Sequence, residues 1–228
     1  MQEIEFKFQV PVKKRKALQK AFTLLKAEPI HLAAQYFDTA DQTLAKHCIA
    51  IRRRQENDEW KQTFKAVDTA KVLSRLELEF DIAPPETTTL DLDNYKDYSA
   101  IYKKLKRALG LPLPTLELLF ETNIQRLRVL QDVGSSTVEI ALDIGKIFEE
   151  QNSVDIFEIE FELKQGSIED LIAFIQPWVQ KYQLSLDTHS KSDYGLLAVR
   201  QQSSFSAQYQ TPLVLNRSSS EVEALQSI

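Results

Sequence analysis

The sequence predicts an α+β fold in which an antiparallel sheet closes into a β-barrel with a polar lumen and helices packed on the outside. Runs of strand-like alternation occur in two groups, and each group is followed by an amphipathic helix, which is typical of antiparallel α+β domains. The polar face of almost every run carries charged residues at two-residue spacing. Helices that cover the apolar face of such a sheet would leave the charged face inside the barrel.

Alternation of apolar and polar residues with period two identifies the strands. The first strand is expected at residues 3–8, where Ile4, Phe6 and Phe8 alternate with charged residues. The other extended segments are expected at 33–40, 48–55, 60–67 and 75–82, and then at 116–131, 137–148 and 157–164.

Three segments have the period of an amphipathic helix. The first, 11–26, has Pro11 in its first turn, where a missing N–H costs nothing. The second, 94–110, ends at Gly110. The third, 167–182, begins after the capping residue Ser167 and contains Pro177, where we expect a kink. Residues 83–93 are expected to form a loop.

The chain is expected to contain one large domain at 1–200 and a Ser/Gln-rich linker, or the start of a missing C-terminal helical domain, at 201–228. The last segment begins like a capped helix at 218–220 and has apolar residues at Val222 and Leu225. We therefore expect the natural chain to continue into a further helical domain; a plain disordered terminus is the alternative.

Composition argues against several classes of protein. A net charge of −5 argues against nucleic-acid binding. Cys48 is the single cysteine, so the chain cannot form an intrachain disulfide, and this suits a reducing compartment. We see no signal peptide and no apolar run near the ~20 residues that a membrane helix needs. The expected location is the cytoplasm, with no membrane partner.

The charged faces fall into basic and acidic blocks. They comprise Arg52 with Arg54, Lys61 with Lys65, Arg75 with Glu77 and Glu79, Arg126 with Arg128, Glu139 with Asp143, and Glu158 with Glu160 and Glu162. For any one strand, the simpler interpretation is that its charged face is exposed to solvent on the outside of the sheet. Like charges that share a face repel each other, however, so the repetition indicates that each block meets a partner of opposite charge.

A metal-bound polyphosphate would suit both kinds of block. Carboxylates in twos and threes are hard oxygen ligands suited to Mg²⁺ or Mn²⁺. Guanidinium and ammonium groups suit phosphate oxygens. The charged face is therefore predicted to line the inside of the barrel.

These residues carry a family resemblance. The opening Glu3-x-Glu5-x-Lys7 resembles the ExExK signature of the CYTH family, the triphosphate tunnel metalloenzymes. Further matching segments follow in the family's order: QYFDT at 35–39, IAIRRR at 49–54, TFK at 63–65, RLELE at 75–79, ALD at 141–143, EIEFE at 158–162 and SK at 190–191. The family often has a glycine before the Arg-rich strand, whereas this chain has Cys48, and we expect that difference to alter a turn.

The resemblance implies roles for the matching residues. Those implied to bind metal are Glu3, Glu5, Asp143, Glu158, Glu160 and Glu162. Those implied to bind triphosphate oxygens are Lys7, Arg52, Arg54, Lys65, Arg75, Arg126, Arg128 and Lys191, of which Lys7, Arg52, Arg54 and Lys65 are the candidate catalytic residues. Glu77 and Glu79 are expected either to bind metal or to orient neighbouring basic groups. No general base can be assigned, and no covalent nucleophile is required.

Within the family the chain most resembles the bacterial inorganic triphosphatases, which usually carry a helical CHAD domain after the CYTH domain. The resemblance implies Mg²⁺- or Mn²⁺-dependent hydrolysis of inorganic triphosphate, or another polyphosphate, to phosphate and pyrophosphate. The alternatives are a thiamine triphosphatase, a class IV adenylate cyclase and, outside the enzymes, a non-catalytic polyphosphate-binding module.

Overall fold

The computed structural model describes residues 4–67, 75–149 and 152–199. In these residues one antiparallel sheet runs in the order β5-β4-β3-β2-β6-β7-β8-β1-β9. The strands are β1 (Glu5–Gln9), β2 (Glu28–Asp38), β3 (Ile49–Glu56), β4 (Glu59–Val67), β5 (Arg75–Ile82), β6 (Glu117–Val133), β7 (Ser136–Glu149), β8 (Asn152–Gln165) and β9 (Ser185–Leu186). The prediction of an antiparallel α+β architecture is confirmed.

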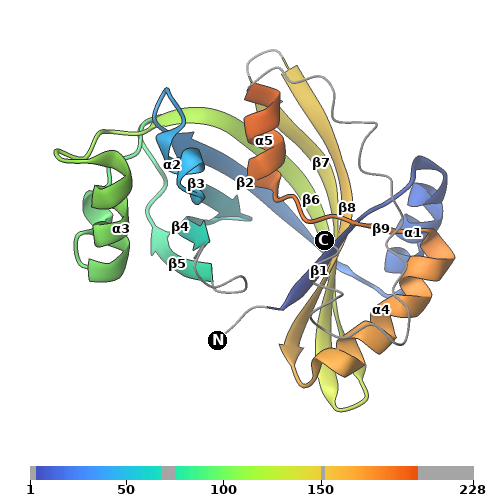
Figure 1. Cartoon of the computed structure of the whole chain (residues 1–228). Coiled ribbons are helices and arrows are strands. Elements are labelled where there is room, and N and C mark those ends of the chain that lie inside the picture. The colour runs from blue at the N-terminus through green and yellow to red at the C-terminus, as the bar shows by residue number, and fades with distance from the viewer. Residues whose placement is uncertain (1–3, 68–74, 150–151, 200–228) are drawn as a thin grey trace.

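The helices are α1 (Val12–Leu24), α2 (Thr43–Lys46), α3 (Ser99–Leu109), α4 (Ile168–Tyr182) and α5 (Lys191–Val199). The side chain of Ser167 accepts the backbone N–H of Asp170 and so caps α4 as its sequence indicates. Figure 1 shows α1 and α4 near β8, β1 and β9, and α3 at the opposite end of the sheet, beside β3 to β5. The sequence did not predict α2 and α5.

Two apolar clusters hold the helices against the outer face of the sheet. In one, Leu18 and Phe22 of α1 and Leu171 of α4 pack with residues such as Phe161 of β8. In the other, Ile101 and Leu105 of α3 pack with Phe64 of β4 and their neighbours. These side chains are at most 4 % exposed, and each large one contributes roughly 1.5–3 kcal/mol of burial free energy. The alternating strands therefore bury one face and turn the charged residues to the other.

The expectation of a closed barrel is wrong. The sheet is open, because β5 pairs only with β4 and the short β9 pairs only with β1 in the described residues. Period-two patterning specifies which residues share a face, whereas closure depends on the tilt and stagger of all strands together. The placement of every helix outside is also wrong, because α5 lies on the charged side of the sheet.

A third apolar cluster explains the position of α5. Ile30, Tyr36, Phe120 and Ile124 lie on the same face as the charged residues, and Leu196 of α5 packs against their cluster. A Cβ added to Gly195 would lie only 2.2 Å from ring atoms of Phe120, so this position needs a glycine for close approach. The middle of the charged face is thus covered by a helix.

Cys48, where the family often has glycine, precedes β3 in a left-handed backbone conformation with φ of 54°. That conformation favours glycine, and another residue adopts it at a cost of order 1 kcal/mol. The expectation that this residue alters the turn relative to the family stays a prediction.

No helix in the described part of the chain is both long and apolar enough to cross a membrane.

Candidate functional site

The register of four neighbouring strands brings the central site residues together. Glu158 of β8 lies opposite Asp143 of β7, and Asp143 lies opposite Arg126 of β6. Two residues further along β8, Glu160 lies opposite Lys7 of β1. Since directly opposite residues share a face, all five side chains lie on the charged side of the sheet.

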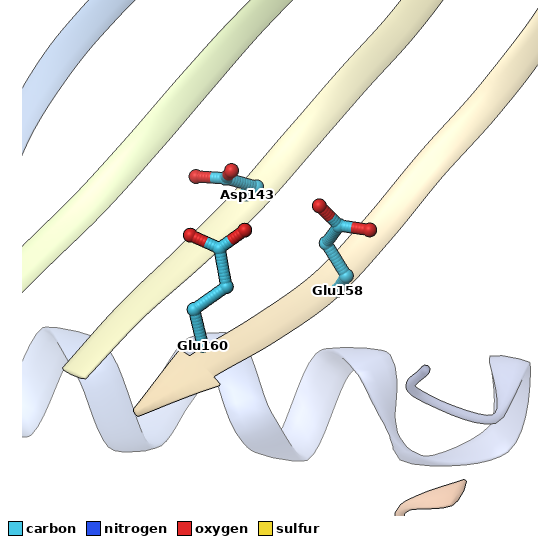
Figure 2. Close-up of side chains that lie close together, drawn as sticks. All are labelled: Asp143, Glu158 and Glu160. Atoms are coloured by element: carbon cyan, nitrogen blue, oxygen red, sulfur yellow. The ribbon is translucent and has the colours of Figure 1, made fainter. Parts of the chain in front are cut away.

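Three carboxylates converge at the centre of this site. Figure 2 shows the side chains of Asp143, Glu158 and Glu160 close together beside the strands. Each offers one oxygen, and these oxygens lie within 4.8 Å of one another. Asp143 and Glu158 are fully buried and Glu160 is 9 % exposed. Buried, convergent carboxylate oxygens are the ligand set that Mg²⁺ or Mn²⁺ prefers, so the residues present fit such a cation. We call these three residues the acidic triad.

Lys191, the first residue of α5, pairs with every member of the acidic triad. Its Nζ lies 2.7 Å from Oδ2 of Asp143, 2.5 Å from Oε1 of Glu158 and 3.0 Å from Oε1 of Glu160. An ammonium group therefore occupies the centre of the carboxylates. The sequence-based expectation was that this ammonium binds phosphate oxygens, a role that stays a prediction.

Two further cations complete the pairing. Arg126 donates from Nε and from a terminal nitrogen to the two oxygens of Asp143, each at 2.7 Å, and also contacts Glu160. Lys7 Nζ lies 3.6 Å from Oε2 of Glu158. Three anions thus meet three cations, and two of the facing pairs, Arg126 with Asp143 and Lys7 with Glu160, carry opposite charges on neighbouring strands.

These pairings shift the pKa values of the triad in different directions. Burial raises the pKa of Asp143, but Lys191 and Arg126 outweigh it and hold that pKa well below its usual range. The same balance lowers the pKa of Glu160. Burial prevails at Glu158, where the pKa is raised despite Lys191 and Lys7.

A second group of charged residues lies on β3, β4 and β5. Lys65 pairs with Glu77 at 3.0 Å, and Arg54 pairs with Glu79 at 3.5 Å. Arg52 donates to Thr63 and to the hydroxyl of Tyr36, each at 3.4 Å. We call Arg52, Arg54 and Lys65 the basic wall. Glu77 and Glu79 thus contact these cations, and their role, binding metal or orienting the basic groups, stays a prediction.

Electrostatics connects the basic wall with the acidic triad. Burial lowers the pKa of Arg54, and the positive charges of Arg52 and Arg126 lower it further. Arg126 belongs to the triad's cluster, so its field reaches the basic wall. A polyanion between the two groups would relieve this repulsion.

The remaining residues of the sequence-based site are more dispersed. Glu5 is exposed and lies opposite Glu162, which pairs with Lys164 at 2.6 Å. Arg128 pairs with the exposed Glu28 at 3.2 Å. Glu3 and the side chain of Arg75 lie outside the described residues. Their assigned roles stay predictions.

Residues of the site that the sequence did not assign include Gln9 and Asp187. Asp187 accepts hydrogen bonds from Gln9 and Tyr194 beside Lys7. Lys61, which the sequence places on the charged face, lies 3.7 Å from Glu79. Gln9 has the period-two phase of the charged residues next to it, a signal that could have identified it. Asp187 precedes α5 and has no such pattern.

Comparison with known proteins identifies relatives. A sequence model of the CYTH domain matches residues 1–193. The inorganic triphosphatase of Haemophilus influenzae is 32% identical over 201 residues, which are 86% of this chain and 55% of that protein. The chain therefore spans about half the length of this curated relative.

Solved structures share the fold. A putative adenylate cyclase from Bacillus halodurans has a TM-score of 0.59 at 20% identity, with 85% of this chain and 98% of that chain covered. A putative adenylyl cyclase from Hippeastrum with a dominant triphosphatase activity has a TM-score of 0.56 at 19% identity, with coverage of 85% and 95%.

Proposed function

The chain belongs to the CYTH family, and we propose that it hydrolyses inorganic triphosphate to phosphate and pyrophosphate with the help of Mg²⁺ or Mn²⁺. The observation that carries this proposal is the buried acidic triad on the same face of the sheet as the basic wall. The relationship to an inorganic triphosphatase supports the choice of substrate. The reaction is proposed for the charged face of an open sheet.

The acidic triad would hold the divalent cation. When bound, Mg²⁺ or Mn²⁺ would supply positive charge next to the phosphate oxygens and promote ionisation of the attacking water. Asp143 and Glu160 have lowered pKa values and so remain ionised and able to bind a cation at neutral pH. Glu5 and Glu162 lie one step further along the strands, and we propose that they contribute at the edge of this site.

The basic residues would bind and orient the substrate. Arg126 and Lys7 lie beside the triad. Arg52, Arg54 and Lys65 lie on β3 and β4, which are separated from β7 and β8 by β2 and β6. Arg128 and Arg75 are proposed to assist. Positive charge around the bridging and terminal oxygens stabilises the loose transition state of phosphoryl transfer. Water is the nucleophile in this scheme, and no side chain forms a covalent bond to phosphorus.

Lys191 must change partners when the site is loaded. Its ammonium occupies the centre of the acidic triad, where a divalent cation would be held. Loading therefore requires this ammonium to move. Because Lys191 begins α5 on the same face, the displaced ammonium would remain close enough to bind a phosphate oxygen.

The apolar part of the charged face favours a substrate without a ring. Tyr36 stacks on Phe120 with ring centroids 4.5 Å apart, and α5 covers both, so they are only 6 % and 3 % exposed. Neither ring offers an open surface to an adenine or a thiazolium group. We therefore prefer inorganic triphosphate to thiamine triphosphate and to the cyclase substrate ATP.

The proposal is tested by phosphate release from triphosphate, pyrophosphate, ATP and thiamine triphosphate with Mg²⁺, Mn²⁺ or EDTA. Triphosphate should be cleaved fastest, because the triad lies on β7 and β8 and the basic wall on β3 and β4, so that a longer phosphate chain is needed to contact both. Pyrophosphate is the matched control, since it carries the same groups on a shorter chain. Equal rates on the two would contradict the proposal, and so would full activity in EDTA.

A further inference from the structure

Asp187 is a buried carboxylate outside the acidic triad, between β9 and α5. It is 8 % exposed, and its backbone N–H donates to the carbonyl oxygen of Lys7 at 2.9 Å. The side chain is therefore fixed next to β1, at the residue whose ammonium faces the triad. The proposed reaction gives Asp187 no part.

Uncharged donors surround this carboxylate. Oδ2 accepts from Nε2 of Gln9 at 2.7 Å and from the hydroxyl of Tyr194 at 2.8 Å. Oδ1 accepts from the backbone N–H of His189 at 2.9 Å and contacts the ring Nδ1 of His189 at 3.2 Å. A carboxylate oxygen offers about two lone-pair sites, so Gln9 and Tyr194 together use the hydrogen-bonding capacity of Oδ2.

The ammonium of Lys7 is held differently. Its Nζ lies 3.5 Å from Oδ2 of Asp187 and 3.6 Å from Oε2 of Glu158, and Lys7 is 9 % exposed. Among the described residues, Nζ has no hydrogen-bond acceptor. A buried ammonium carries three N–H donors, and leaving them unsatisfied is costly. The ammonium of Lys7 is therefore placed to donate hydrogen bonds to an acceptor that the described residues do not supply.

We propose that Asp187 is a positioning residue, which holds the ammonium of Lys7 midway between two carboxylates so that its N–H groups stay available to a phosphate oxygen. Asp187 supplies negative charge opposite Glu158, but both lone pairs of Oδ2, its oxygen nearest to Lys7, already accept from Gln9 and Tyr194. Without that charge, the ammonium would move onto Glu158, pair with it fully and face the substrate less. This inference rests on the proposed function for the identity of the ligand.

The charge state of Asp187 agrees with this role. Burial raises its pKa, but Lys7, Gln9, the amide of His189 and Tyr194 outweigh burial and lower the pKa overall. The carboxylate is therefore an anion at neutral pH. Tyr194 also lies on α5, and the Lys7 ammonium is 5.6 Å from its ring centre, so the same contact ties α5 to β1.

A merely structural role for Asp187 makes a different prediction, and a mutant cycle separates the two. The variants are Asp187→Asn, which keeps the shape and removes the charge, Lys7→Met, and the double variant. Positioning predicts that Asp187→Asn raises KM for inorganic triphosphate about tenfold or more in the wild type and less than twofold in the Lys7→Met background. A structural role predicts the same fold-change in both backgrounds, and that result would overturn the inference.

Asp38→Asn is the matched control. Asp38 is 3 % exposed and accepts the backbone N–H groups of Leu44 and Ala45 at the start of α2, away from Lys7. Its loss should destabilise the protein but leave the KM of the folded enzyme within twofold. Tyr194→Phe frees one lone pair of Asp187 for Lys7 and should raise KM in the same direction as Asp187→Asn, by a smaller factor.

Urea unfolding of the ligand-free variants makes the test independent of catalysis. If the wild type cleaves no triphosphate, the proposed function fails, yet the Asp187–Lys7 contact can still be measured. Positioning predicts that the shifts in unfolding midpoint for Asp187→Asn and Lys7→Met are not additive, while those for Asp38→Asn and Lys7→Met are. Additive shifts for the first pair would overturn the inference whatever the activity.

Discussion

Arg126 and Asp143 lie opposite each other on neighbouring strands and form a two-point ion pair, Nε to Oδ1 and a terminal nitrogen to Oδ2, each at 2.7 Å. The Asp143 side chain is fully buried and the Arg126 side chain is 19 % exposed. Such a pair is rigid and geometrically specific. It shows how a basic residue of β6 and an acidic residue of β7 are brought into direct contact by the register of the two strands.

Loss of Arg126 should destabilise the ligand-free protein strongly. Arg126→Met leaves Asp143 buried without its guanidinium partner, which costs about 3–5 kcal/mol for a buried pair. The free energy of unfolding in urea measures this. Arg128→Met is the matched control on the same strand, because its ion pair with Glu28 is largely exposed and is worth about 0–1 kcal/mol. Similar losses for the two variants would contradict the assigned pairing.

Glu160→Gln should remove most cation binding and activity. The substitution replaces a charged ligand with a neutral, weaker one. Loss of a residue that only supports a ligand already costs about tenfold or more in metal affinity, so loss of a ligand should cost at least as much. Calorimetry with Mn²⁺ measures this affinity. Phosphate release from triphosphate should fall at least as far, with circular dichroism nearly unchanged. Glu169→Gln, an exposed position at the start of α4, should behave as wild type. Wild-type Mn²⁺ affinity in Glu160→Gln would exclude the triad as the cation site.

Lys191→Met should separate cation binding from turnover. Removing the ammonium leaves the three carboxylates less compensated, so Mn²⁺ should bind severalfold more tightly without triphosphate, while turnover falls. Calorimetry measures the first effect and phosphate release the second. Lys20→Met, an exposed change on α1, serves as the control. Unchanged Mn²⁺ affinity in Lys191→Met would show that this ammonium does not compete with the cation.

Stability should fall in acid. The folded pKa of Asp143 lies well below its ordinary value of 3.8, and the pKa values of Glu160 and Asp187 are also lowered. The unfolded chain therefore binds more protons, and stability present above about pH 4 is lost as pH falls. Burial raises the pKa of Glu158 above its ordinary value of 4.5. Just above pH 4.5 the folded protein therefore binds the extra proton, and Glu158 adds stability there as the pH falls. The urea midpoint should drop between pH 5 and pH 3, and less so in Asp143→Asn; a flat wild-type profile would contradict the pairing.

The sequence predicts the phase of the strands because period two is a local property. It therefore places Arg52 with Arg54, and Glu158 with Glu160, on one face, as the structure has them. The openness of the sheet depends on the register and tilt of nine strands together and cannot be read locally. Helix α5 was missed because it is short and contains Gly195, a poor helix former that close packing on Phe120 requires.

The approach of Asp187 to Lys7 could not be predicted, since it depends on the pairing of the two-residue strand β9 with β1. No local pattern marks so short a strand. The same holds for Lys191, whose match to the family motif indicated phosphate binding while its fold position places it among carboxylates. A motif supplies the residue, and the packing of α5 decides which charges that residue meets.

The most direct test of the central claim is ³¹P nuclear magnetic resonance of inorganic triphosphate incubated with the protein and Mg²⁺ or Mn²⁺. A metal-dependent triphosphatase should convert the triphosphate signals into phosphate and pyrophosphate in equal amounts, and EDTA or the Glu160→Gln substitution should stop the conversion. Triphosphate that stays intact with either cation, or is degraded equally well in EDTA, would contradict the account.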